Sequence, residues 1–140
     1  MSDIDTYIAI DKKVAGRTYF PILTEEEALA EFNRCVVYMV QKDNKIVGTV
    51  SYQSKEDGSI YLSGLAVDPD YQGKGIGRLI LEKVLNEIGN SKIIWLVTHP
   101  ENTKVVTLYE SLGFIITERK EDYFGDGEPR IVLKLNSQFV

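Results

Sequence analysis

A glycine-rich stretch in the middle of the chain restricts the possible folds more than any other feature of the sequence. It consists of Gln72, Gly73, Lys74, Gly75, Ile76, Gly77 and Arg78. It follows an extended apolar segment, residues 60–67, and opens a run of residues with helical periodicity. A turn at this place directs successive backbone N–H groups and the positive end of the helix dipole at one point. The stretch therefore predicts a strand, a phosphate-binding turn and a helix, in that order.

The segments around this turn predict a mixed α/β fold. Alternating or continuous apolar runs indicate strands at residues 6–10, 36–41, 45–54, 60–67, 92–98, 114–119 and 130–135. Helices are expected after the N-cap residue Thr24, over residues 76–88 and over residues 102–112. The helix at 76–88 has one apolar face, made of Ile76, Leu79, Ile80, Val84, Leu85 and Ile88. Because a helix connects them, the strands at 60–67 and 92–98 are expected to be parallel neighbours, beside an antiparallel meander.

The composition is that of an ordinary globular protein. The 140 residues are 44% hydrophobic and 26% charged, which fits a single domain over residues 1–140. No apolar run approaches the length of a membrane span, and the acidic N-terminus lacks the features of a signal peptide. The one cysteine, Cys35, cannot form an internal disulfide and is expected to pack as a small hydrophobic residue. These features predict a cytoplasmic protein with no membrane partner. The net charge of −5 argues against a nucleic-acid partner.

Three kinds of glycine-rich phosphate loop can be compared with this stretch. A Walker A loop ends in Gly-Lys-Ser/Thr, which the chain lacks, and a dinucleotide fingerprint needs Gly-x-Gly-x-x-Gly. The spacing of Gly73, Gly75 and Gly77 is Gly-x-Gly-x-Gly instead. The pyrophosphate loop of coenzyme A transferases, Gln/Arg-x-x-Gly-x-Gly/Ala, is matched in full by Gln72, Gly75 and Gly77. A plain loop-to-helix turn is the structural alternative, although it rarely needs three glycines, whose backbone entropy costs stability.

On these residues the sequence resembles the GNAT superfamily of acyl-CoA-dependent N-acetyltransferases, from about residue 36 to residue 135. Four features occur in the order and spacing of that family. They are the strand end at 65–71, the glycine loop at 72–78, Asn102 seven residues before Tyr109, and the segment 108–114, which is similar to the family's Leu-Tyr-x-x-x-Gly-Phe signature. The small size and the segment 123–130 look most like the branch that includes the ribosomal-protein N-terminal acetyltransferases.

The resemblance implies a fold and a cosubstrate. The fold would be a bent, mostly antiparallel sheet of six or seven strands, with a central parallel pair and helices on both faces. The strands at 60–67 and 92–98 would diverge to admit the pantetheine arm of acetyl-CoA, with no metal. Backbone groups of Leu65, Ala66 and Val67 would bind the pantetheine amides, and the amides of residues 73–78 the pyrophosphate. Asn102 would contact the cofactor, or cap a helix, or do both.

The resemblance also suggests catalytic groups. Tyr109 stands where the family places the general acid that protonates the coenzyme A sulfur; its structural alternative is a core aromatic. Many relatives carry a glutamate base at the position of Tyr61, and the strand at 60–67 has no carboxylate. The remaining candidates for the base are His99, a water chain ending at Tyr61, Ser63 or Glu128, or no dedicated base at all.

These expectations lead to a hypothesis about function. The protein would move an acetyl group from acetyl-CoA to a primary amine by direct attack in a ternary complex, as a monomer or homodimer. The acceptor would be a small amine or a peptide or protein N-terminus. The loop that holds Tyr123 and Glu128 would either face the acceptor or form a solvated hairpin tip. The alternatives are a non-catalytic coenzyme A-binding regulatory module and, more distantly, a nucleotide-binding protein.

Overall fold

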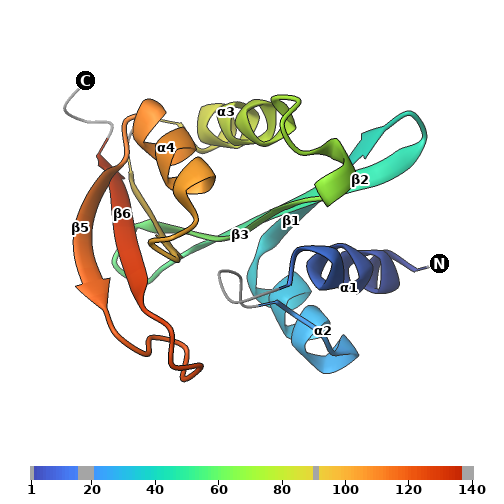
Figure 1. Ribbon diagram of the computed structural model, residues 1–140, viewed down its shortest axis with the longest axis horizontal. Helices are drawn as coiled ribbons and strands as arrows, with labels where there is room; N and C mark the ends of the chain where they lie inside the picture. Colours follow the sequence, from blue (N-terminus) through green and yellow to red (C-terminus); the bar gives the residue numbers. More distant parts are fainter. Residues whose placement is uncertain (1, 16–20, 90–91, 137–140) are drawn as a thin grey trace.

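A six-stranded sheet organises the described part of the chain, residues 2–15, 21–89 and 92–136, in this computed structural model (Figure 1). The strands are β1 (Val36–Lys42), β2 (Lys45–Ser54), β3 (Ile60–Val67), β4 (Ile93–Thr98), β5 (Ile115–Lys120) and β6 (Arg130–Asn136). Their order in the sheet is β1-β2-β3-β4-β6-β5. All neighbours are antiparallel except β3 and β4, which are parallel. The predicted mixed fold with a central parallel pair is confirmed.

Helices cover both faces of this sheet. They are α1 (Asp3–Val14), α2 (Glu25–Arg34), α3 (Ile76–Ile88) and α4 (Thr103–Ser111), with a short 3-10 helix η1 (Pro69–Tyr71) before the glycine-rich turn. Figure 1 shows α3 and α4 on one face and α1 and α2 on the other. Among the described residues, none of these helices combines the length and the apolar character that a membrane span requires.

The helix α1 replaces the strand expected at residues 6–10, and that prediction is wrong. The hydroxyl of Ser2 accepts a hydrogen bond from the backbone N–H of Asp5 (3.1 Å) and so caps the helix. The buried residues of α1 are Tyr7, Ile10 and Asp11, at the i, i+3, i+4 spacing of a helix face. The five residues 6–10 are too few to reveal this spacing. Because they are helical, the sheet has six strands.

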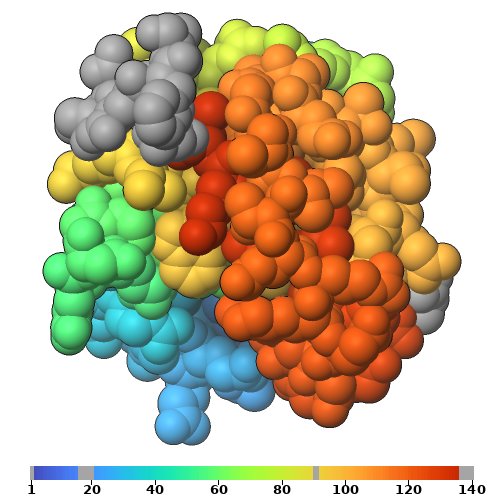
Figure 2. Space-filling model, turned by 90° about the vertical axis from the view of Figure 1, so that its left-hand side faces the viewer, coloured from blue at the N-terminus to red at the C-terminus, as the bar shows by residue number. Residues whose placement is uncertain are grey.

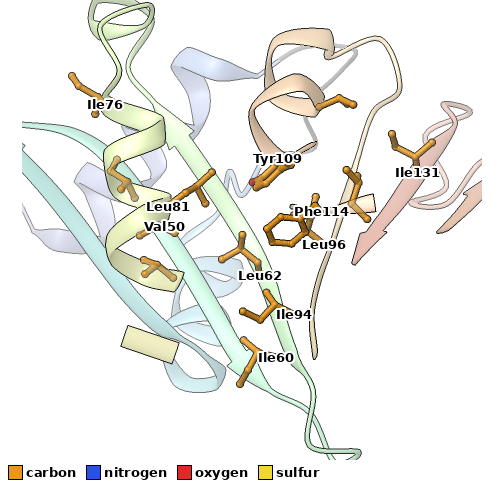
Figure 3. Close-up of a cluster of buried hydrophobic side chains, with 14 of the residues drawn as sticks. Val50, Ile60, Leu62, Ile76, Leu81, Ile94, Leu96, Tyr109, Phe114 and Ile131 are labelled. Carbon is orange, nitrogen blue, oxygen red and sulfur yellow. The ribbon is translucent and has the colours of Figure 1, made fainter. Parts of the chain in front are cut away.

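The hydrophobic core lies between the sheet and the helices α3 and α4 (Figure 3). Leu62 and Ile94 of the central strands meet Leu81 of α3 and Phe114 after α4 there. The expected apolar face of α3 is right at Ile76, Ile80 and Val84, which are buried. It is wrong at Leu79, which is 54% exposed, whereas Leu81 is fully buried in its place. The buried stripe of the helix therefore includes the position after Ile80.

The central strands separate soon after they meet. The strand β3 pairs with β4 at two positions, Ile60 with Ile94 and Tyr61 with Trp95. Beyond them β3 continues alongside β2 as far as Val67, while β4 pairs with β6 along its whole length. The edge of β3 that faces β4 therefore carries backbone groups without a strand partner among the described residues. This divergence opens a wedge beside the N-terminus of α4.

The strand β5 forms the far edge of the sheet. All six of its residues are exposed, and Ile115 is 64% exposed. Figure 2 views the molecule onto this edge, where β5 and the loop that follows it, drawn in orange, run down the middle of the surface. That loop leads back to β6 and forms one wall of the functional site described next.

Candidate functional site

Two adjoining cavities occupy the wedge between β3 and β4. The outer cavity has a volume of about 540 Å³ and lies between the end of β3, the glycine-rich turn and the start of α4. The inner cavity has a volume of about 100 Å³ and reaches between the two strands to Tyr109 and Arg130. Leu65, Asn102 and Val105 belong to the walls of both cavities, so the two cavities form one path.

Most of the residues predicted to bind a cofactor line the outer cavity. These are residues 65–67, 72–73 and 75–78, together with Asn102. Lys74 is not in that wall, and its ammonium group lies over the ring of Tyr71 instead, 5.3 Å from the ring centre. Lys104, in the first turn of α4, contributes a positive charge to the wall that the sequence interpretation missed. Its position two residues after Asn102 was the available signal.

The start of α3 differs from the starts of the first two helices. The helices α1 and α2 each begin with a hydroxyl cap and acidic residues in the first turn. The N-cap of α3 is Gly75, which supplies no side-chain hydrogen bond, and the first turn holds no acidic residue. Gly73 and Gly75 both have φ of +78°, a conformation that residues with a side chain rarely adopt. The N–H groups at this helix start, with the positive dipole end, can therefore receive an anion.

Polar contacts hold the turn in place. The side-chain amide of Gln72 donates to the backbone carbonyl of Val67 (2.9 Å), which ties the turn to the end of β3. The guanidinium of Arg78 contacts Ser111 at 2.8 Å and Glu82 at 2.9 Å. Because its side chain is half exposed and lines the outer cavity, Arg78 can also approach a ligand there.

Tyr109 stands at the inner end of the path. It lies on α4, is 4% exposed and packs edge-on against Phe114, with 5.3 Å between the ring centres. Figure 3 shows its hydroxyl directed from α4 toward β3. No group in the described residues forms a hydrogen bond with that hydroxyl. Burial raises the pKa of the Tyr109 hydroxyl well above its ordinary value, so the phenol keeps its proton at neutral pH.

Asn102 begins α4 but does not cap it with its side chain. The backbone carbonyl of Asn102 accepts the first helical hydrogen bond, from Val106 (3.0 Å), and no side-chain capping bond is formed. The amide side chain of Asn102 is therefore not committed to the helix. Since Asn102 lines both cavities, its amide can contact a molecule that passes from one to the other.

His99 is buried and both of its ring nitrogens are engaged. Nδ1 accepts a hydrogen bond from the backbone N–H of Glu101 (3.0 Å), and Nε2 lies 2.8 Å from a carboxylate oxygen of Glu128. With Nδ1 as an acceptor, the neutral ring carries its proton on Nε2 and donates it to Glu128. Neither nitrogen then offers a lone pair to a substrate, and His99 is outside the walls of the inner cavity. The geometry thus favours a structural role for His99 rather than a role as the general base. Glu128 is likewise engaged, by its hydrogen bond with His99.

The same residues form a cluster of possible metal ligands. In the described part of the chain, His99, Glu101 and Glu128 form one group whose possible ligand atoms lie within 4.8 Å of one another. A metal bound at Nε2 would need the lone pair of that atom, and the tautomer set by Glu101 places a proton there. The hydrogen-bond pattern therefore disfavours a metal at these residues.

Three of the four residues predicted to contact an acceptor are divided between two hollows, and Glu128 lines neither of them. Tyr61 and Ser63 line the inner cavity, and the ring of Tyr61 stacks on Trp95 at 4.3 Å. Burial raises the pKa of the Tyr61 hydroxyl to about 12, so Tyr61 stays protonated at neutral pH. Tyr123 instead lines a neighbouring groove on the β4–β6–β5 side, and its neighbour Phe124 reaches the inner cavity.

Two buried charges in this region were missed from the sequence. Arg130 is 1% exposed, lines the inner cavity and forms an ion pair with Asp126 (2.9 Å). Glu31 of α2 is 5% exposed and accepts hydrogen bonds from Ser51 and Ser63. The signal for Glu31 was a carboxylate on the apolar face of its helix, three residues after the buried Ala28.

Comparisons with known proteins agree with this geometry. A family model described as the acetyltransferase (GNAT) family matches residues 5–114. The [Ribosomal protein bS18]-alanine N-acetyltransferase of Escherichia coli strain K12 is 38% identical over 65 residues, which are 45% of this chain and 44% of that protein. The matched stretch thus spans somewhat less than half of this curated relative.

Two solved structures have the same fold. The crystal structure of the ribosomal-protein-S18-alanine N-acetyltransferase from Escherichia coli superposes with a TM-score of 0.79 at 27% identity, over 95% of this chain and 86% of that one. A GNAT family acetyltransferase from Elizabethkingia anophelis, with acetyl-CoA bound, superposes with a TM-score of 0.76 at 19% identity, over 97% and 91% of the two chains.

Proposed function

The chain belongs to the acetyltransferase (GNAT) family, and on that premise we propose that it transfers an acetyl group from acetyl-CoA to a primary amine. The observation that carries this proposal is the continuous path from the uncapped start of α3 to the hydroxyl of Tyr109. One end of the path suits an anion and the other end holds a buried phenol. An acyl-CoA has a pyrophosphate and a thioester joined by a flexible arm, which matches both ends.

The cosubstrate would bind to backbone groups at the start of α3 and along the open edge of β3. The N–H groups at the start of α3 would hold the pyrophosphate, with Arg78 and Lys104 supplying positive charge nearby. The open edge of β3 would hydrogen-bond the pantetheine amides in the manner of an added strand. The carbonyl of Val67 already accepts from Gln72, so the pantetheine amides would use the other backbone groups of this edge.

Tyr109 would serve as the acid for the leaving sulfur. The neutral amine attacks the thioester carbonyl, a C–N bond forms, and the C–S bond breaks. A phenol is a weaker acid than a thiol, with ordinary pKa values of about 10 and about 8.5, so the proton transfer to sulfur alone is uphill. It becomes favourable because Tyr109 regains a proton from the cationic nitrogen of the new amide. Counted from the ammonium form of the acceptor, which must first lose a proton, the net result is an N-acetylated amine, a free coenzyme A thiol and one proton released to solvent.

For the acceptor, we propose the α-amine of a peptide or protein, with a small amine as the alternative. The E. coli relative acts, by its name, on an alanine of ribosomal protein bS18. The inner cavity is small, and the described residues of its wall include no carboxylate that could pair with the second ammonium group of a polyamine. A peptide N-terminus brings one amine followed by neutral amide groups.

The test is release of coenzyme A thiol from acetyl-CoA with a panel of amines. The panel contains alanine-initiated peptides, free amino acids, spermidine and an aminoglycoside, and acetyl-CoA binding is measured separately by titration. Turnover with the peptides, above that with spermidine, would support the proposal. Tight binding of acetyl-CoA without turnover on any amine would refute it in favour of a coenzyme A-binding module. ATP that competes with acetyl-CoA would instead favour a nucleotide-binding protein.

A further inference from the structure

A buried polar network lies on the face of the sheet opposite α3 and α4. Its centre is the carboxylate of Glu31, whose Oε2 accepts hydrogen bonds from the hydroxyls of Ser51 (3.0 Å) and Ser63 (3.1 Å). The two hydroxyls lie 2.8 Å from each other, and the thiol of Cys35 is 3.5 Å from Ser63 Oγ. The outer oxygen, Oε1, accepts from the guanidinium of Arg34 (3.1 Å). A carboxylate is expensive to bury, and here its oxygens have partners.

Ser63 connects this network to the reaction path. It lines the inner cavity, whereas Ser51 is fully buried and Glu31 lies behind both hydroxyls. The local backbone explains its place: Gly64 pairs with Ser51 and Leu62 pairs with Tyr52, so Ser63 is the extra residue of a β-bulge. Bulges redirect side chains and occur beside functional sites. The inner cavity therefore communicates with a buried carboxylate through a single hydroxyl, that of Ser63.

We propose that Glu31 receives the proton that the acceptor amine must lose, through the hydroxyl of Ser63. The inference rests on the proposed function and identifies its base. The ammonium group gives a proton to Ser63 Oγ as the Ser63 hydroxyl proton passes to Glu31 Oε2. The serine remains a hydroxyl, the carboxylate becomes a carboxylic acid, and the amine gains its lone pair. Glu31 later returns the proton to solvent, which accounts for the proton released in the overall reaction.

The surroundings of Glu31 single it out as the proton acceptor of this network. The titratable or charged groups that face it are Tyr7 from α1, Arg34 on its own helix, Cys35 at the end of α2, and Tyr61 from β3. Burial raises the pKa values of the Tyr7, Cys35 and Tyr61 side chains, so these three stay protonated at neutral pH. The carboxylate is then the network's basic group, while His99 has no lone pair to offer.

The experiment compares variants with an alanine-initiated peptide and acetyl-CoA between pH 6 and pH 9. Glu31→Gln keeps the shape of the side chain and removes its charge. Ser63→Ala removes the relay hydroxyl, and Ser63→Thr keeps it. Glu26→Gln is the matched control, because it makes the same change at an exposed position of the same helix. For each variant, kcat and kcat/KM for the peptide, the dissociation constant of acetyl-CoA and the melting temperature are measured.

We expect Glu31→Gln to lower kcat/KM for the peptide about 100-fold at pH 6, the lower end of what a general base contributes. The loss should fall below about tenfold at pH 9, because a free α-amine with a pKa near 7.7 to 8.0 is then mostly neutral. Ser63→Ala should reproduce this pH dependence, Ser63→Thr should restore activity, and the Glu31→Gln, Ser63→Ala double variant should be no worse than either single variant. Acetyl-CoA affinity should stay within about twofold in all of them.

A loss of activity that is equal at pH 6 and pH 9, or losses that multiply in the double variant, would overturn the relay. Equal activity of Glu31→Gln and the Glu26→Gln control would overturn the relay as well. The proposed function would still stand in that case, provided that the wild-type protein turns over. An inactive wild-type protein that binds acetyl-CoA would overturn the proposed function and the relay together.

Discussion

Replacing Tyr109 by phenylalanine should change activity and stability in opposite directions. The substitution removes one hydroxyl and leaves the ring that packs at 5.3 Å against Phe114. That hydroxyl is buried and has no hydrogen-bond partner in the described residues. An unpaired buried hydroxyl costs about 1 kcal/mol or more in proteins. Tyr109→Phe should therefore raise the free energy of unfolding by about 1 kcal/mol and the melting temperature by about 3 °C.

The loss of activity should be much larger than this gain. General acid catalysis contributes about 10² to 10⁴-fold, which corresponds to about 3 to 5 kcal/mol of the activation barrier. We expect kcat to fall by that factor, and the dissociation constant of acetyl-CoA to stay within about twofold, since the pyrophosphate and pantetheine contacts lie elsewhere. Steady-state thiol release with a saturating amine measures the first quantity, a binding titration the second, and urea unfolding the stability.

Alkaline pH gives an independent check on the stability. Because the pKa of the Tyr109 hydroxyl is raised in the folded protein, folding favours its protonated form. This contribution is complete below the unfolded pKa of about 10 and is lost as the pH rises through the folded pKa. The wild type should therefore lose stability above pH 10 faster than Tyr109→Phe. Nearly unchanged kcat would refute the acid role, and a lower free energy of unfolding in the variant would mean that the hydroxyl has a structural partner.

Three further predictions concern the turn and its surroundings. Gly75→Ala and Gly58→Ala, at φ of +78° and +87°, should each lower the free energy of unfolding in urea by about 1 kcal/mol. Only Gly75→Ala should weaken acetyl-CoA binding, and equal affinities of the two variants would show that the turn does not contact the cofactor. Arg78→Ala should weaken acetyl-CoA binding about three- to tenfold, and a loss that does not shrink in high salt would contradict an ionic contact. Asp68 accepts from Lys13 (2.7 Å), which holds the pKa of Asp68 below its usual range. The carboxylate therefore adds stability that is present above about pH 4 and is lost as the pH falls through the lowered pKa. Asp68→Asn should destabilise the protein less at pH 3 than at pH 7, and equal destabilisation at both would refute the ionic interpretation.

Most of the sheet could be predicted because local signals agree there. The turn between β1 and β2 is an example: Asp43 and Asn44 have φ of 53° and 62°, the left-handed conformations that these residues tolerate in hairpins. The glycine turn was equally clear, since Gly73 and Gly75 have the positive φ that their residue type suggests. In both places the sequence requires a particular backbone over a few residues.

The errors fall where distant segments decide the outcome. At residues 6–10 the choice between strand and helix depended on Tyr7, Ile10 and Asp11 being buried beneath a neighbouring helix and sheet, which no five-residue pattern reveals. Glu31 is understandable only beside hydroxyls 20 and 32 positions later in the chain. The partner of His99 Nε2 is Glu128, 29 positions away. For Glu31 and His99 the sequence showed a titratable residue, but only the fold brings its hydrogen-bond partners beside it.

The narrow contact between β3 and β4 has a consequence for how the protein opens. It divides the sheet into two halves, β1-β2-β3 and β4-β6-β5, whose internal pairing is extensive and whose shared pairing is two residue pairs long. In native-state hydrogen exchange, amides at the contact between β3 and β4 should exchange through an opening of low free energy. The two halves should then exchange as separate cooperative units. A pantetheine arm lying in the seam would bridge both halves. Saturating acetyl-CoA, at about 100 times its dissociation constant, adds about 2.7 kcal/mol to global stability, and it should also merge the two units into one.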